Sequence, residues 1–305
     1  MRRYLLTSVV HAVSVTLGVS ILSFVFMHLS GDPVMLMLPP DATDKQIEEF
    51  RERMGFNDPI PLQYFRFLSS AVRGDFGTSL RHQQPAMGLV LERLPATLEL
   101  AVAGMGLALL VAVPFGILSA TRRGSVVDYL GMGGALLGLS MPNFWVGIIG
   151  ILIFSVKLHL LPTAGRGTWA QLVLPGLALG SYLMALLARL TRSGMLEVID
   201  QDYVRTARAK GLPERLIIWR HALMNALIPL VTVVGLQMGE LLGGTVVIET
   251  VFAWPGVGRL ILQAVFQRDY PVVQAAVLIL AMIFVVANLL VDTAYRYLDP
   301  RIRHA

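Results

Sequence analysis

Apolar residues are gathered along this chain in long runs, and polar residues occupy short segments between them. A helix that crosses a hydrocarbon core about 30 Å thick needs roughly 20 apolar residues. Inside a bilayer each helix must satisfy its own backbone hydrogen bonds, so runs of this length indicate transmembrane helices. The pattern predicts an all-α membrane protein with six such helices, over residues 8–29, 96–120, 130–156, 172–191, 226–249 and 272–295.

The distribution of basic residues predicts the orientation. Arg2 and Arg3 precede the first run, Arg122 and Arg123 follow the second, and the segment between the fourth and fifth runs is also rich in arginine. The short loops on the other side contain few basic residues. Cytoplasmic loops carry the excess of lysine and arginine, so both termini are predicted to be cytoplasmic. No small-residue cleavage site follows the first run, which is therefore expected to be retained.

Composition agrees with a membrane protein. Of 305 residues, 55% are hydrophobic and 15% are charged, against about 25% charged in soluble domains. The basic residues form no continuous stripe, so we expect no nucleic-acid partner. The chain has no cysteine, and its six histidines lack metal-ligand spacing. We therefore expect no catalytic residue, no metal and no cofactor in this chain.

The first long loop, residues 31–95, is predicted to lie outside the membrane. Its charge pattern is helical over 44–54, a second amphipathic stretch covers 62–72, and 74–79 forms a turn. Either an ordered cover over helix ends or a docking surface fits this pattern. The predicted division is thus a first span at 1–30, a helical external cap at 31–95 and a core domain at 96–305.

The second long loop, residues 192–225, is cytoplasmic and basic. Asp202 suits the first turn of a helix, Gly211 suits its end, and Pro213 suits the start of a second helix over 214–221. Two short helices joined at a glycine would form a rigid projection below the membrane. The alternative is an amphipathic helix lying on anionic lipid.

This loop resembles that of a known family. Two segments carry the resemblance: Asp-Tyr-Val-Arg-Thr-Ala-Arg-Ala-Lys-Gly at 202–211 and Arg-His-Ala-Leu at 220–223. They are similar to the cytoplasmic loop of bacterial binding-protein-dependent ABC permeases, and more narrowly to that of the dipeptide, oligopeptide and nickel group. The wider family has Glu-Ala-Ala where this chain has Arg205, Thr206 and Ala207, and many members have proline at Met224. The resemblance extends over nearly the whole chain, through the motifs at 31–34, 74–79, 93–97, 242–244, 249–258 and 299–303.

The resemblance implies a type I ABC importer fold in which the second loop is a coupling helix that contacts a separate ATPase subunit. It implies ATPase-coupling roles for a set of neighbouring residues: Tyr203, Arg205, Thr206, Ala207, Arg208, Ala209, Lys210, Gly211, Leu212 and Glu214. By the same resemblance, the external gate and the contact with a binding protein involve Glu249, Phe252, Trp254, Pro255 and Gly256.

The energy source is expected to be another chain. A phosphate-binding loop needs lysine followed by serine or threonine after a glycine-rich turn, and Lys45, Lys157 and Lys210 all lack that setting. ATP and Mg²⁺ are therefore expected on partner subunits. An ion-coupled secondary transporter is the distant alternative, but no inverted repeat is visible.

Polar residues inside the spans are candidates for the translocation path. A carboxylate at the middle of a span costs about 2.5 kcal/mol or more unless it faces protein or water. Glu240, with Gln237 beside it, either lines the path or bonds to a partner helix. Asn288 and Asp292 either line the path or cap a helix end.

The resemblance therefore implies a permease subunit in the bacterial inner membrane that moves di- or oligopeptides from a periplasmic binding protein into the cytoplasm. Glutathione and chelated nickel are the alternative substrates. The expected partners are a homologous second permease, two ATP-binding subunits, the binding protein and membrane lipid.

Overall fold

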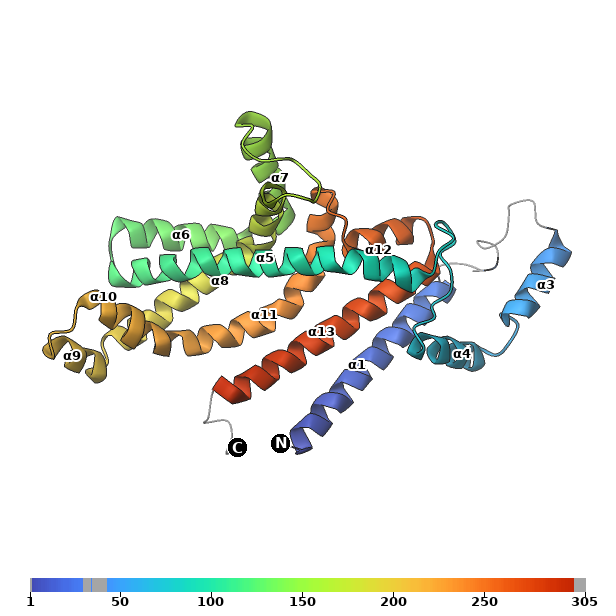
Figure 1. Cartoon of the computed structure of the whole chain (residues 1–305), viewed down its shortest axis with the longest axis horizontal. Helices are drawn as coiled ribbons and strands as arrows, with labels where there is room; N and C mark the ends of the chain where they lie inside the picture. The colour runs from blue at the N-terminus through green and yellow to red at the C-terminus, as the bar shows by residue number, and fades with distance from the viewer. Residues whose placement is uncertain (1, 30–33, 35–42, 299–305) are drawn as a thin grey trace. The chain divides into compact units, whose positions relative to one another are not determined.

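The computed structural model describes residues 2–29, 34 and 43–298, with the side chains of 2–9, 53, 54, 228 and 291–298 left aside. The described residues are helical nearly throughout, and the one β-bridge among them joins Thr78 to Pro85. The helices, labelled in Figure 1, are α1 (Arg2–Leu29), α3 (Asp44–Met54), α4 (Ile60–Val72), α5 (Ala86–Thr121), α6 (Val126–Ser140), α7 (Asn143–Gly150), the π-helix η1 (Ile151–Lys157), α8 (Trp169–Ile199), α9 (Asp202–Ala209), α10 (Glu214–Leu216), the π-helix η2 (Ile217–Ala222), α11 (Leu223–Val251), α12 (Val257–Phe266) and α13 (Tyr270–Leu298).

The predicted spans are confirmed, and one of them is not straight. In the part of the chain that the structure describes, five helical segments are long and apolar enough to cross a membrane: Val10–Leu29, Ala86–Thr121, Trp169–Ile199, Pro229–Val251 and Tyr270–Leu290. The sixth predicted span consists of α6 followed by α7 and η1, which are bent by 110°. The bend falls at Met141 and Pro142, because proline cannot continue the hydrogen bonding of a helix.

The chain divides into two compact units. Unit 1 contains residues 1–96 and 256–289, and unit 2 contains 97–255 and 290–305. The division predicted from the sequence, at 30/31 and 95/96, follows membrane topology and stays a prediction.

Unit 1 has an apolar core in which the first turn of α5 packs with α12 and α13, with Val90, Val257 and Val272 among its buried residues. The α4 helix of the expected external cap packs on α1 through aromatic rings. The Phe24 ring lies 5.4 Å from the Tyr64 ring, and the Tyr64 hydroxyl lies 2.7 Å from the Ser20 hydroxyl.

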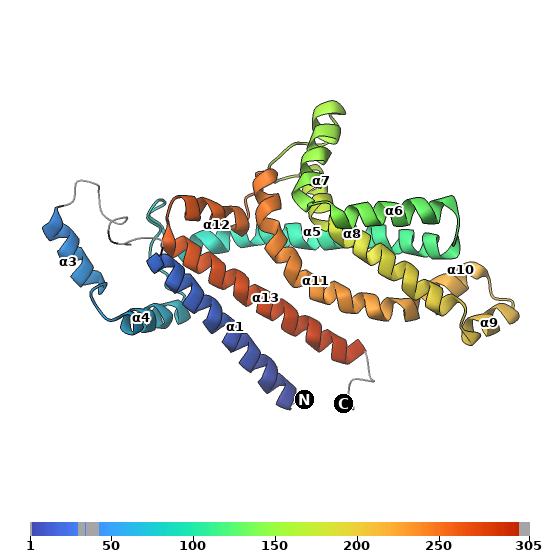
Figure 2. The ribbon, with the colours of Figure 1, turned by 180° about the vertical axis from the view of Figure 1, so that it is seen from behind.

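Unit 2 is built around α8, which contacts α6, α7 and α11. Glycines let α5 approach it closely. A Cβ atom at Gly180 would lie 2.5 Å from the Gly104 carbonyl oxygen, and one at Gly116 would lie 2.7 Å from the Ala188 carbonyl oxygen. Such close helix contacts are typical of membrane proteins. Both views show α9 and α10 where α8 ends and α11 begins, at the opposite end of these helices from α7 (Figures 1 and 2).

Candidate functional site

The loop between α8 and α11 forms a small helical projection, as the sequence predicts. Asp202 lies in the first turn of α9, where its charge complements the helix dipole. The helix ends at Lys210, and Gly211 takes a left-handed conformation with φ of 75°, its N–H donating to the Arg208 carbonyl at 2.9 Å. Pro213 then caps α10 in extended conformation. The helix–glycine–helix geometry is thereby confirmed.

The projection has its own core. Val204, Ala207 and Ile217 are buried, and Val198 and Leu212 pack against them. Val198 belongs to the last turn of α8, so this core attaches α9 to the helix before it. Burial of a valine or isoleucine side chain contributes about 1.5–3 kcal/mol, so these contacts help to hold α9 in place.

An ion pair closes the turn around Gly211. The Arg208 guanidinium donates to the Glu214 carboxylate at 2.7 and 3.2 Å, and it also reaches the Ile199 carbonyl at 3.5 Å. The hydrogen bond from Arg208 lowers the pKa of Glu214 below its usual value, and the same bond raises the pKa of Arg208. Both side chains are partly exposed, so the pair contributes at most about 1 kcal/mol.

A second connection joins α9 to α11. The Asn225 side-chain amide donates to the Tyr203 hydroxyl at 2.8 Å and to the His221 carbonyl at 3.1 Å. The Tyr203 hydroxyl in turn donates to the His221 carbonyl at 3.5 Å. A force on α9 would therefore reach both α8, through the small core, and α11, through Tyr203.

The predicted coupling residues divide into two groups. Ala207 is buried and Leu212 is half-buried, so these two support the projection from within. The others are exposed. Arg205, Thr206 and Ala209 follow one another at helical spacing on the outer side of α9, away from Val204 and Ala207. A partner protein would contact this outer face.

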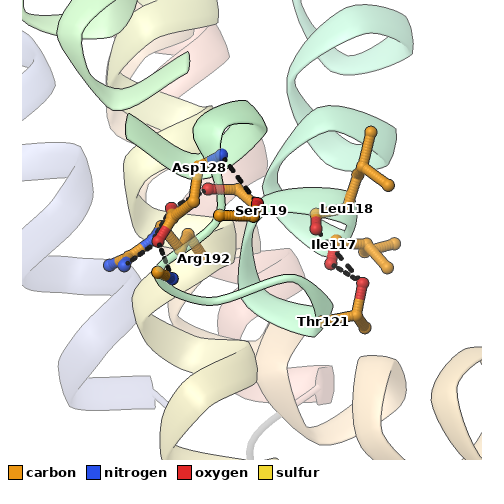
Figure 3. A network of polar contacts seen from close by, with 8 residues as sticks. Ile117, Leu118, Ser119, Thr121, Asp128 and Arg192 are labelled. Atoms are coloured by element: carbon orange, nitrogen blue, oxygen red, sulfur yellow. Dashed lines mark hydrogen bonds and ion pairs between the residues drawn. The ribbon is translucent and has the colours of Figure 1, made fainter. Parts of the chain in front are cut away.

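Close to the projection, α8 is clamped to the turn between α5 and α6 (Figure 3). The Arg192 guanidinium donates to both carboxylate oxygens of Asp128, at 2.6 and 2.8 Å. The Ser119 hydroxyl donates to Oδ1 of the same carboxylate, and the Gly124 N–H donates to Oδ2 at 3.0 Å. Asp128 is buried and accepts from four donors on three elements, so it fixes α8 about two turns before that helix ends.

Sequence reasoning missed this clamp. One signal was available, because Ser125 and Asp128 have the spacing of a capping box, and the Ser125 hydroxyl accepts from the Asp128 N–H at 3.3 Å. That spacing marks the start of a helix, but it does not show that Arg192, 64 residues later, is the partner.

Comparison with known proteins identifies the family. The model of the binding-protein-dependent transport system inner membrane component matches residues 112–304, and the model of the N-terminal region of such components matches residues 1–101. The chain belongs to this family. The permease is 43% identical to the oligopeptide transport system permease protein AppB of Bacillus subtilis, over 100% of both chains. It is also 43% identical to the glutathione transport system permease protein GsiC of Pectobacterium atrosepticum, again over 100% of both.

Two further comparisons agree. The dipeptide transport system permease protein DppB of Alkalihalophilus pseudofirmus is 43% identical over 100% of this chain and 98% of its own. A solved chain of the MetNI methionine ABC transporter, in an inward-facing conformation, has a TM-score of 0.57 at 19% identity and covers 70% of this permease and 97% of itself. The type I importer fold is thus confirmed, and the chain is a multi-pass permease subunit of an ABC importer of the inner membrane.

The residues predicted for the external gate are mostly buried. Phe252 and Trp254 are fully buried, and the buried Glu249 carboxylate accepts from the Thr97 hydroxyl at 2.7 Å. In this conformation these three side chains cannot touch a docked protein, so any part they take in the gate is through packing. Gly256 is also buried, and Pro255 is half-buried.

A concave surface does occur beside them. A cavity of 370 Å³ is lined by Glu99, Arg166 and Pro255, among others. Arg166 pairs with Glu99 at 2.6 Å and lies 6.0 Å from the centre of the Trp254 ring. The role of Glu249, Phe252, Trp254, Pro255 and Gly256 at the external gate stays a prediction.

The candidate path residues lie on two helices, α11 and α13. Glu240 is exposed at the middle of α11, and Gln237 is half-buried one turn earlier. Asn288 is half-buried on α13, and the side chain of Asp292 lies outside the described part of the chain. Glu240 shares its exposed face with Leu236 and Val247, so this face of the permease is open to water, lipid or another chain.

Proposed function

We propose that this permease moves short peptides from a periplasmic binding protein into the cytoplasm, with glutathione and chelated nickel as the alternative substrates. The observation that carries the proposal is full-length identity of 43% to relatives named for oligopeptide, dipeptide and glutathione transport. Glutathione is itself a modified tripeptide, so the three names describe one chemical class.

We propose further that the transporter contains a second, homologous permease, two ATP-binding subunits and an extracytoplasmic binding protein. A second permease would cover the exposed face of α11. That placement would remove the cost of exposing Glu240 to lipid at the middle of a span. The path would then run between the two permeases, with Glu240 facing it.

ATP and Mg²⁺ would bind to the partner subunits. The support for this is the absence from the sequence of a lysine with the setting of a phosphate-binding loop. The outer face of α9 would dock on an ATP-binding subunit. ATP binding would favour one permease conformation only through a difference in affinity for two states of this projection.

The experiment is substrate-stimulated ATP hydrolysis by the reconstituted importer with its binding protein. We expect di- and tripeptides to stimulate hydrolysis and to enter proteoliposomes. Stimulation by glutathione alone or by a nickel chelate alone would replace the proposed substrate with that alternative. Uptake driven by an ion gradient without ATP would contradict the mechanism itself.

A further inference from the structure

Unit 1 contains a cavity that takes no part in the proposed coupling or path. It has a volume of 550 Å³ and lies among α1, α4, the segment 76–83 and the first turns of α13. Its walls combine polar side chains with aromatic rings, which include those of Phe24, Phe50, Phe56, Phe67 and Phe76. The volume lies within the range of small-molecule sites in proteins, about 300–1,000 Å³.

Two polar side chains of the wall, Tyr270 and Gln274, have unused hydrogen-bonding capacity. Tyr270 is 7% exposed, and its buried hydroxyl has no hydrogen-bond partner within the described part of the chain. Gln274, also 7% exposed, donates to the Met27 sulfur at 3.6 Å, and a thioether is a weak acceptor. A buried hydroxyl without a partner is costly, so a ligand with an oxygen acceptor would be stabilised here.

The charge of the wall excludes a zwitterion. Arg66 is the one charged side chain among the described wall residues, and it pairs with Asp58. The amide nitrogen of Gln63 is already used, donating to the Phe56 and Asp58 carbonyls at 2.9 and 2.8 Å. A free peptide would bring an ammonium and a carboxylate into a wall with no counter-charge to spare.

The position of the cavity indicates the source of a neutral ligand. Phe24 and Met27 lie in the last two turns of α1, and Tyr270 and Gln274 lie in the first two turns of α13. Both sets are at the ends of spans that face the outside when the termini are cytoplasmic. Aromatic residues at this level meet the ester region of the bilayer.

We infer that this cavity binds one acyl chain of a membrane phospholipid, with the Tyr270 hydroxyl donating to the ester carbonyl of that chain. The aromatic walls hold the hydrocarbon, and the headgroup stays in the membrane interface. The site is separate from the residues proposed for coupling and for the path, so it does not depend on the proposed substrate.

The test uses the assembled importer in nanodiscs that contain phosphatidylethanolamine with a photoreactive diazirine on one acyl chain. Ser70→Phe places a ring in the cavity, and Ser69→Phe is the matched control, since Ser69 is the neighbouring residue of α4 outside the cavity wall. We expect labelling of the 60–83 and 270–274 segments to fall about fivefold or more in the Ser70 variant and to stay unchanged in the control.

A second variant keeps the inference testable if the Ser70 variant does not fold. Tyr270→Phe removes only the hydroxyl, so it should retain the fold. We expect it to raise the lipid concentration needed for half of the full thermal stabilisation about three- to tenfold. Equal labelling in Ser70→Phe and wild type would overturn the inference. So would displacement of the label by a dipeptide, which would make the cavity a peptide site.

Discussion

Replacement of Asp128 by asparagine tests the clamp between α8 and the α5–α6 turn. The change preserves the shape of the side chain, but an amide nitrogen cannot accept the second hydrogen bond from Arg192, and the negative charge is lost. Removing one partner of a buried ion pair costs 3–5 kcal/mol. Because the Arg192 side chain is 25% exposed and can reach water, we expect the lower end, about 3 kcal/mol.

The measurement is the free energy of unfolding in mild detergent for the wild type, Asp128→Asn, Arg192→Gln and the double variant. Removing both charges leaves no unpaired ion, so the double variant should recover part of the loss, with a coupling energy of about 2 kcal/mol. A loss below about 0.5 kcal/mol in Asp128→Asn, or strictly additive single changes, would show that the pair of Asp128 and Arg192 does not hold α8 in place.

Two further substitutions test the packing around Phe252 and the ion pair between Arg208 and Glu214. In Gly147→Ala the new Cβ would lie 2.9 Å from the buried Phe252 ring, so overpacking should lower the free energy of unfolding by about 1–3 kcal/mol. Gly150→Ala is the control, because its Cβ would make only ordinary contacts. Equal losses in the two variants would contradict this packing. Glu214→Gln should speed amide exchange of residues 210–213. Arg208 lowers the pKa of Glu214, so the stabilisation that their ion pair gives the turn is full above the usual pKa near 4.5 and is lost as the pH falls below it. Exchange that is insensitive to both the substitution and acid would show that the pair does not hold the turn.

The local features of this chain could be predicted from its sequence. Spans are determined by run length and hydropathy, and both are properties of neighbouring residues. The break at Pro142 and the turn at Gly211 are also local, since each depends on the backbone conformations that one residue type allows. The sequence could not give the 110° bend that follows the break, because its size depends on the helices packed around it.

Long-range partners could not be predicted for a physical reason. Asp128 and Arg192 are ordinary charged residues near span ends, and only the packing of α5, α6 and α8 brings them together. Trp254 shows the same limit. The resemblance implies that it contacts a binding protein at the external gate, yet its side chain is fully buried.

We propose above that the outer face of α9 docks on an ATP-binding subunit and so couples this permease to ATP hydrolysis. Ala209 is exposed on that face, and Ala170, exposed at the start of α8 on the predicted external side, is its matched control. In the reconstituted importer we expect Ala209→Trp to reduce both peptide uptake and substrate-stimulated hydrolysis about tenfold, within the usual range of coupling free energies. Ala170→Trp should leave both unchanged. Wild-type uptake and stimulated hydrolysis in a correctly assembled Ala209→Trp complex would contradict the claim.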